Sequence, residues 1–169
     1  MSSPSIHASP PADSDADDSA ERYQRAYASA LRLLARREHS VLELRHKLTA
    51  RSVDAALIER VLVELLDSNL LSDARFTEVY VRGRFERGYG PARIRAELRE
   101  RGIGDELVQP ALEALADDWI ASAVRQHSKR FGGGCPDDYR ERARQMRFLQ
   151  QRGFSGEQIR AVLATAGDR

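Results

Sequence analysis

A short sequence pattern that returns after about fifty residues constrains this chain more than any other feature. Each copy has an arginine, a small residue and an apolar residue, followed by apolar side chains at helical spacing. The copies are Arg51-Ser52-Val53, Arg101-Gly102-Ile103 and Arg152-Gly153-Phe154, each with a leucine three residues before its arginine: Leu48, Leu98 and Leu149. Repeats of this length are typical of stacked helical units. The sequence therefore predicts a modular array rather than one domain around a pocket.

The apolar spacing is helical from Arg22 onward, and no alternating run of β-branched residues predicts a strand. Breaks and capping residues predict nine helices in three sets of three, the first over residues 22–37. Capping residues are expected at Ser40, Asp54, Ser72 or Asp73, and Ser155. We expect an all-α fold of three tandem three-helix repeats in an elongated, curved array. The divisions are a disordered acidic leader over residues 1–21 and repeats over residues 22–72, 73–117 and 118–169.

Charge is distributed unevenly along the chain. Met1–Glu21 holds five acids and no base, which leaves the rest with 27 bases, 21 acids and a net charge of +6. Only Lys47 and Lys129 are lysine, so the positive charge is almost all arginine. Arginine suits bidentate contact with phosphate or carboxylate, although a GC-rich genome gives the same bias. The single cysteine excludes an internal disulfide, and the absence of a signal or membrane segment predicts a cytoplasmic protein.

No pattern in the sequence predicts catalysis. The glycines at 88, 90 and 132–134 lack the residues that complete a phosphate-binding loop. His39 and His46 are separated by a predicted helix break and lack a glutamate at ligand spacing, so we interpret them as surface residues. Cys135 has no histidine or carboxylate at helical spacing to activate it. We therefore expect a protein that is not an enzyme and uses no metal or cofactor.

Arginine is concentrated in two segments. Residues 75–101 hold eight arginines against four glutamates, a net charge of +4. In the last repeat a polar stripe follows one face of a predicted helix through Arg140, Arg144 and Arg147. Solvation and the helix dipole explain part of this clustering, but an uncompensated arginine stripe gains from an anionic partner. Tyr80 and Tyr89 either pack or lie beside arginines at a binding surface.

A specific resemblance to the RecX family, whose members regulate the bacterial recombinase RecA, is carried by three segments. The second repeat matches over residues 70–76 (Leu-Leu-Ser-Asp-Ala-Arg-Phe), at Tyr80-Val81-Arg82 and over residues 88–103, which begin Gly88-Tyr89-Gly90-Pro91. Residues 40–48 resemble the family's first-repeat motif, and residues 148–155 resemble its third. The resemblance extends over about residues 27–166, and the acidic leader and the glycine loop at 132–134 depart from it.

The resemblance implies a non-enzymatic inhibitor of RecA that acts in recombination, DNA repair and the SOS response. We expect a monomer that binds the RecA–DNA filament in its groove, suppresses ATP hydrolysis and strand exchange, and binds no membrane. Contacts with single- or double-stranded DNA are expected to reach phosphates, without sequence preference and with strong salt dependence. The candidate contact residues are Arg82, Arg84, Arg87, Arg93, Arg95 and Arg99 in the second repeat, Arg140, Arg144 and Arg147 in the third, and Tyr80 and Tyr89.

Two other functions fit the same residues. A three-helix unit is compatible with a helix-turn-helix, so a sequence-specific DNA-binding regulator is one alternative. Against it, the arginine-rich helices hold few Asn or Gln side chains for reading bases. The other alternative is a protein scaffold whose arginines are solvated and whose apolar patches make every contact. The sequence leaves open whether a filament is capped at its ends or coated along its groove.

Overall fold

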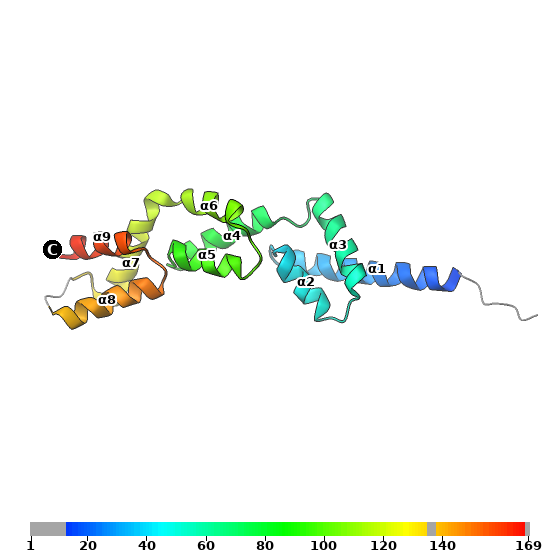
Figure 1. Cartoon of the computed structure of the whole chain (residues 1–169), viewed down its shortest axis with the longest axis horizontal. Helices are drawn as coiled ribbons and strands as arrows, with labels where there is room; N and C mark the ends of the chain where they lie inside the picture. The colour runs from blue at the N-terminus through cyan, green and yellow to red at the C-terminus, as the bar shows by residue number, and fades with distance from the viewer. Residues whose placement is uncertain (1–12, 135–137, 168–169) are drawn as a thin grey trace, which may run out of the picture.

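A computed structural model describes residues 13–134 and 138–167 of the chain. Within these ranges the chain forms nine α-helices, one short 3-10 helix (Ala116–Asp118) and no strand, in the elongated arrangement of Figure 1. The helices are α1 (Asp13–Leu34), α2 (Val41–Thr49), α3 (Ala55–Asp67), α4 (Asp73–Glu86), α5 (Pro91–Arg99), α6 (Asp105–Glu113), α7 (Trp119–Phe131), α8 (Tyr139–Gln151) and α9 (Gly156–Gly167). Among them, none combines the length and apolar character that crossing a membrane requires. The predicted all-α, elongated fold is confirmed.

We call α1–α3, α4–α6 and α7–α9 the first, second and third units. Polar side chains start several of their helices at the predicted positions. Ser40, Asp54 and Ser72 each accept a hydrogen bond from a backbone N–H two or three residues later, at 2.9 to 3.2 Å. Ser155 and Gln158 cap α9 reciprocally, each side chain accepting from the other residue's N–H. These bonds satisfy N–H groups that have no partner within the helix.

The first helix begins earlier than predicted. The sequence predicted a helix over residues 22–37 after a disordered leader, but α1 already includes residues 13–21, so the leader prediction is wrong there. The helix dipole stabilises acidic side chains near a helix N-terminus. An ion pair one turn apart, between Arg22 and Asp18, connects this segment to the rest of α1. Residues 1–12 of the predicted leader lie outside the described residues.

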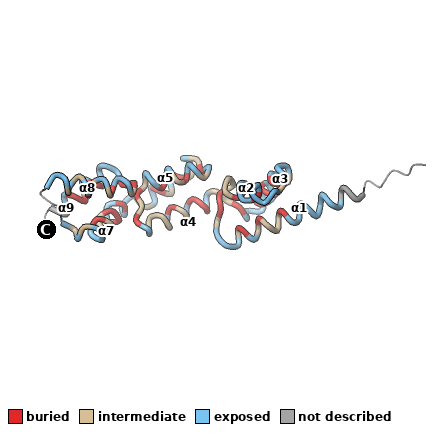
Figure 2. The backbone as a smooth tube through the Cα atoms, turned by 90° about the horizontal axis from the view of Figure 1, so that it is seen from below, coloured by how far each residue is buried: buried red, intermediate tan, exposed pale blue. Residues whose placement is uncertain are grey.

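The buried apolar side chains form two separate clusters. One is built from the first unit and includes Leu44 and Leu48, and the other runs through the second and third units and includes Leu98 and Leu149. The leucines of the repeated pattern, at 48, 98 and 149, have no exposed surface. Burying a leucine stabilises the fold by about 1.5–3 kcal/mol. Figure 2 shows buried stretches alternating with exposed ones along α1, α4 and α5, as expected for amphipathic helices.

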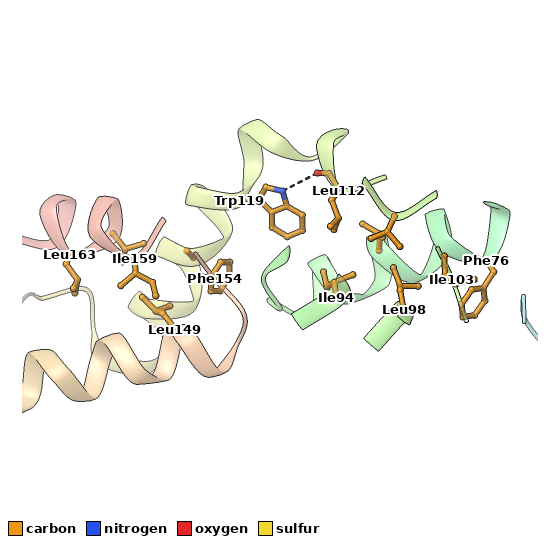
Figure 3. Close-up of a cluster of buried hydrophobic side chains, with 14 residues drawn as sticks. Phe76, Ile94, Leu98, Ile103, Leu112, Trp119, Leu149, Phe154, Ile159 and Leu163 are labelled. Atoms are coloured by element: carbon orange, nitrogen blue, oxygen red, sulfur yellow. Dashed lines mark hydrogen bonds between the residues drawn. The ribbon is translucent and has the colours of Figure 1, made fainter. Parts of the chain in front are cut away.

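The second and third units share their core through aromatic residues. Trp119, at the start of α7, is 4% exposed, and its indole N–H donates to the Leu112 carbonyl at 3.2 Å. Its ring meets Phe85 of α4 edge to face at 5.2 Å between centroids. Figure 3 shows Trp119 and Phe154 where the two units meet. The interpretation of Trp119 as a packing residue between repeats is therefore confirmed.

The two junctions between units use equivalent positions but different bonds. At the second junction, two N–H groups at the start of α5, that of Gly90 among them, donate to the carbonyls of Arg152 and Gly153 at 2.7 and 3.0 Å. A Cβ at Gly90 would lie 2.4 Å from the Gly153 backbone, so this approach requires glycine. At the first junction, the Ser40 hydroxyl at the start of α2 donates to the Arg101 carbonyl at 2.8 Å. The second and third motif arginines, Arg101 and Arg152, therefore mark the junctions.

Candidate binding surface

Five side chains of the second unit, which we call the central cluster, meet where α4 and α5 pack together: Tyr80, Arg84, Tyr89, Arg93 and Glu97. Glu97 accepts hydrogen bonds from the Tyr80 hydroxyl (2.8 Å) and from Arg93 Nε (3.0 Å). It also pairs with Arg84 Nε at 2.7 Å. One carboxylate therefore holds two of the predicted contact arginines, Arg84 and Arg93, within the fold.

Arginines cover the aromatic rings of the central cluster. Guanidinium groups lie 4.9 and 5.3 Å from the ring centre of Tyr80, and 4.5, 5.0 and 5.6 Å from that of Tyr89. Such cation–π contacts occupy ring surface on which a nucleobase would otherwise stack. Tyr80 and Tyr89 are thus packing residues in this structure, and the contact role predicted for them stays a prediction.

The central cluster is electrostatically satisfied. Burial opposes the charge of Glu97, but hydrogen bonds from Tyr80 and Arg93, together with the charge of Arg84, hold its pKa below the ordinary value. Burial raises the pKa of the Tyr80 hydroxyl, and its bond to Glu97 acts in the same direction. The cluster therefore combines ionised Glu97 with a neutral phenol that donates to it.

Two of the three arginines of the repeated motif, Arg101 and Arg152, connect neighbouring units. Arg101 Nε lies 3.2 Å from a carboxylate oxygen of Glu43 in the first unit. Arg152 Nη1 donates to the Gly88 carbonyl of the second unit at 3.1 Å. The recurrence of arginine at one position of the motif was a signal in the sequence. The structural role of these arginines was not predicted from it.

Arg95 and Arg99 face α6. Arg95 Nη1 donates to Asp105 at 2.9 Å, and a second nitrogen of the same guanidinium bonds Gln109. Arg99 lies 3.8 Å from the other Asp105 oxygen and its side chain is 71% exposed, against 31% for Arg95. Arg95 therefore contributes to the α5–α6 contact, whereas most of Arg99 is accessible to a partner.

Arg82, within α4, and Arg87, which directly follows it, are exposed and form no ion pair with the described residues, but they line different grooves. Arg82 lines a groove between α4 and α6 together with Leu107 and Ala111. Arg87 lines a cleft of about 440 Å³ between the first and second units, which Arg37 also lines. The predicted contact arginines of the second unit consequently do not form one continuous surface.

The predicted arginine stripe of the third unit lies on the exposed side of α8. Arg140, Arg144 and Arg147 are exposed, while Leu149 on the opposite side is buried. Arg144 pairs with Glu141 at 3.0 Å. Arg140 and Arg147 form no ion pair with the part of the chain that the structure describes. The stripe is therefore accessible, and its role in binding stays a prediction.

Two further exposed residues on α8 were missed from the sequence. Tyr139, the first residue of the helix, is 82% exposed, and Arg142 is also exposed. Both line a shallow groove along α8 that includes Arg147. The sequence did contain a signal, because Tyr139 is an aromatic residue that precedes alternating arginines. The predicted stripe followed the spacing of Arg140, Arg144 and Arg147 and therefore did not include Tyr139 or Arg142.

One histidine interpretation is wrong. His39 is buried rather than at the surface, with its ring Nδ1 3.0 Å from the Arg37 carbonyl. Burial lowers the pKa of this imidazole, and the charge of Arg37 lowers it further, so the neutral ring packs in the interior. Among the described residues, no three His, Cys, Asp or Glu side chains come together as ligands for a metal. Cys135 lies outside the described residues.

The chain matches three family models of RecX. The model of the first three-helix domain matches residues 26–65, that of the second matches residues 72–112 and that of the third matches residues 116–163. The regulatory protein RecX of Halorhodospira halophila is 49% identical over 140 residues, which cover 83% of this chain and 87% of the relative. The RecX of Chromohalobacter salexigens is 47% identical over 137 residues, which cover 81% and 90%.

Solved structures have the same fold. A crystal structure of RecX from Lactobacillus salivarius matches with a TM-score of 0.73 and 24% identity, over 86% of this chain and 96% of that one. A crystal structure of a regulatory protein RecX matches with a TM-score of 0.76 and 23% identity, over 88% and 76%. At these identities the structures establish the fold, while the family models and the curated relatives establish the family. The chain belongs to the RecX family of regulatory proteins.

Proposed function

We propose that this chain is a non-enzymatic inhibitor of the RecA recombinase that binds the RecA–DNA filament in its groove and suppresses ATP hydrolysis and strand exchange. The observation that carries the proposal is membership of a regulatory family together with an elongated array that exposes arginines on more than one unit. An elongated molecule suits simultaneous contact with several subunits of a filament. Exposed arginines suit DNA phosphates and give affinity without sequence preference.

The contacts of each arginine decide which of them are the best candidates. Arg84, Arg93 and Arg95 are bonded to acidic side chains of the second unit, so their loss changes the fold as well as any contact. The exposed arginines offer cleaner assignments, and we assign phosphate or filament contacts to Arg82, Arg87, Arg99, Arg140 and Arg147. Arg144 shares their surface but already pairs with Glu141.

The test is RecA's ATP hydrolysis on single-stranded DNA, with the full chain added before or after filament assembly at two salt concentrations. We expect inhibition in both orders of addition at substoichiometric protein, and weaker inhibition at the higher salt. Replacing Arg140 and Arg147 together by glutamine should weaken inhibition without changing the thermal midpoint. Arg32→Gln, at an exposed arginine of α1, is the matched control and should inhibit like the wild type.

Three other results of this experiment and its variants would contradict the proposal or favour another function. Absence of inhibition under every condition contradicts the proposal. A footprint at one defined duplex site without RecA would favour the helix-turn-helix regulator. Full inhibition by the double arginine variant would favour a scaffold that contacts the filament through apolar patches.

A further inference from the structure

The exposure of Tyr139 is not explained by packing. The other four tyrosines have partners: Tyr23 and Tyr27 stack on each other, and arginines lie over Tyr80 and Tyr89. Tyr139 is 82% exposed and makes no aromatic, cation–π or side-chain hydrogen-bond contact with the described residues. Exposing a large ring forgoes the stabilisation that its burial would give. A ring in this position is available to a ligand.

The groove beside Tyr139 has the charge of a site for an anion. Its lining is Tyr139, Arg142, Ala143, Met146, Arg147 and Gln150, with no acidic residue among them. Neither Arg142 nor Arg147 forms an ion pair with the described residues. Of the described acids, the two nearest to Tyr139 in sequence are engaged elsewhere: Asp138 caps α8 by accepting from a backbone N–H at 3.0 Å, and Glu141 pairs with Arg144.

We infer that this groove binds single-stranded DNA, with a base stacked on the Tyr139 ring and phosphates held by Arg142 and Arg147. An aromatic ring among unpaired arginines is the combination that single-stranded nucleic acid uses, because its bases have accessible faces and its backbone is anionic. A duplex offers the phosphates but keeps its bases stacked. Arg147 follows Tyr139 by eight positions, which span about 12 Å along a helix and leave room for more than one contact on the same strand.

This inference goes beyond the phosphate contacts of the proposed function and rests on that function only in taking DNA as the partner. Its test contains no RecA. Binding of the full chain to a labelled thymidine oligonucleotide is measured by fluorescence anisotropy, beside an abasic strand and a duplex of the same length. The proposed inhibition of RecA and the proposed DNA site can therefore be refuted independently of each other.

We expect Tyr139→Ala to weaken binding to the thymidine strand by at least about fivefold, because one base–aromatic stack contributes that much or more. The same variant should bind the abasic strand and the duplex like the wild type. Tyr139→Phe should bind all three like the wild type, since it keeps the ring. Arg142→Gln and Arg147→Gln should weaken binding to all three and each lower the single-strand salt slope by about 0.7, whereas Arg32→Gln should not.

Two results would overturn the inference. The first is wild-type affinity of Tyr139→Ala for the thymidine strand. The second is equal loss on the thymidine and abasic strands, which would give Tyr139 a role other than stacking. If Tyr139→Ala kept its DNA affinity but lost affinity for assembled RecA filaments, the groove would be a protein contact instead. Unchanged circular dichroism melts of the variants show that folding is not the cause.

Discussion

Whether an arginine of this chain serves the fold or the surface depends on the carboxylates within its reach. Arg84 and Arg93 share Glu97, whose side chain is 15% exposed, while Arg87 at the end of the same helix as Arg84 has no acidic partner among the described residues. Charge-assisted hydrogen bonds are about twice as strong as neutral ones. Glu97 is therefore the residue on which the central cluster depends.

Glu97→Gln should lower the free energy of unfolding by about 1–3 kcal/mol, because it removes the charge that Arg84 and Arg93 face. Urea denaturation followed by circular dichroism measures the loss. Glu100→Gln, at an exposed glutamate that directly follows α5, is the control and should change stability by less than about 0.5 kcal/mol. Equal effects of the two substitutions would contradict a special role for Glu97.

The stability difference between the wild type and Glu97→Gln should depend on pH. The pKa of Glu97 is lower in the folded chain than its ordinary value of 4.5, so its stabilisation is present above that value and is lost as pH falls through the folded pKa. The difference between wild type and Glu97→Gln should therefore shrink as the solution is acidified below about pH 4.5. A difference that stays constant into acid would mean that the carboxylate charge is not what stabilises the cluster.

At the scale of the helix, the sequence predicts well what neighbouring residues decide. The caps at Ser40 and Asp54 were predictable because donor and acceptor lie within three residues of each other. The bond between Tyr80 and Glu97 was not, because seventeen residues separate them and only the packing of α4 on α5 brings them together. The start of α1 was missed because the leader was interpreted from composition, although helix propagation requires only local bonds.

Two glycines of the second unit should respond oppositely to alanine. Gly90→Ala places a Cβ 2.4 Å from the Gly153 backbone and should destabilise the chain by more than about 1 kcal/mol, since backbone must move at the junction. Gly83 lies inside α4, and a methyl group added there would meet nothing within 4 Å, so Gly83→Ala should stabilise by about 0.5–1 kcal/mol. Thermal melts measure the stability of the two variants. An unchanged melting temperature for Gly90→Ala would contradict the close backbone approach at the second junction.

For the whole molecule, the difference between the two junctions matters more than the similarity of the three units. The second and third units share a core and are joined by two backbone hydrogen bonds at 2.7 and 3.0 Å. The first unit has its own core and contacts the second through polar groups, such as Ser40 with Arg101 and Glu43 with Arg101. The repeated pattern predicted three similar units, but it carried no information about which neighbours share a core, because that depends on residues outside the repeated motif, such as Trp119 and Phe85.

Because the first unit has its own core, we expect it to unfold locally without the second and third units. Leu44→Ala and Leu98→Ala each empty space at a side chain with no exposed surface and should each cost about 2–5 kcal/mol. In native-state hydrogen exchange, Leu44→Ala should reduce protection in α1–α3 and leave α7–α9 unchanged, because no shared apolar core transmits the loss. Leu98→Ala should reduce protection in α7–α9 as well as in α4–α6, because its cluster continues through Leu149 and Phe154. If Leu44→Ala weakened α7–α9 as much as α1–α3, the polar junction would couple the units as strongly as a common core does, and the chain would open as one body.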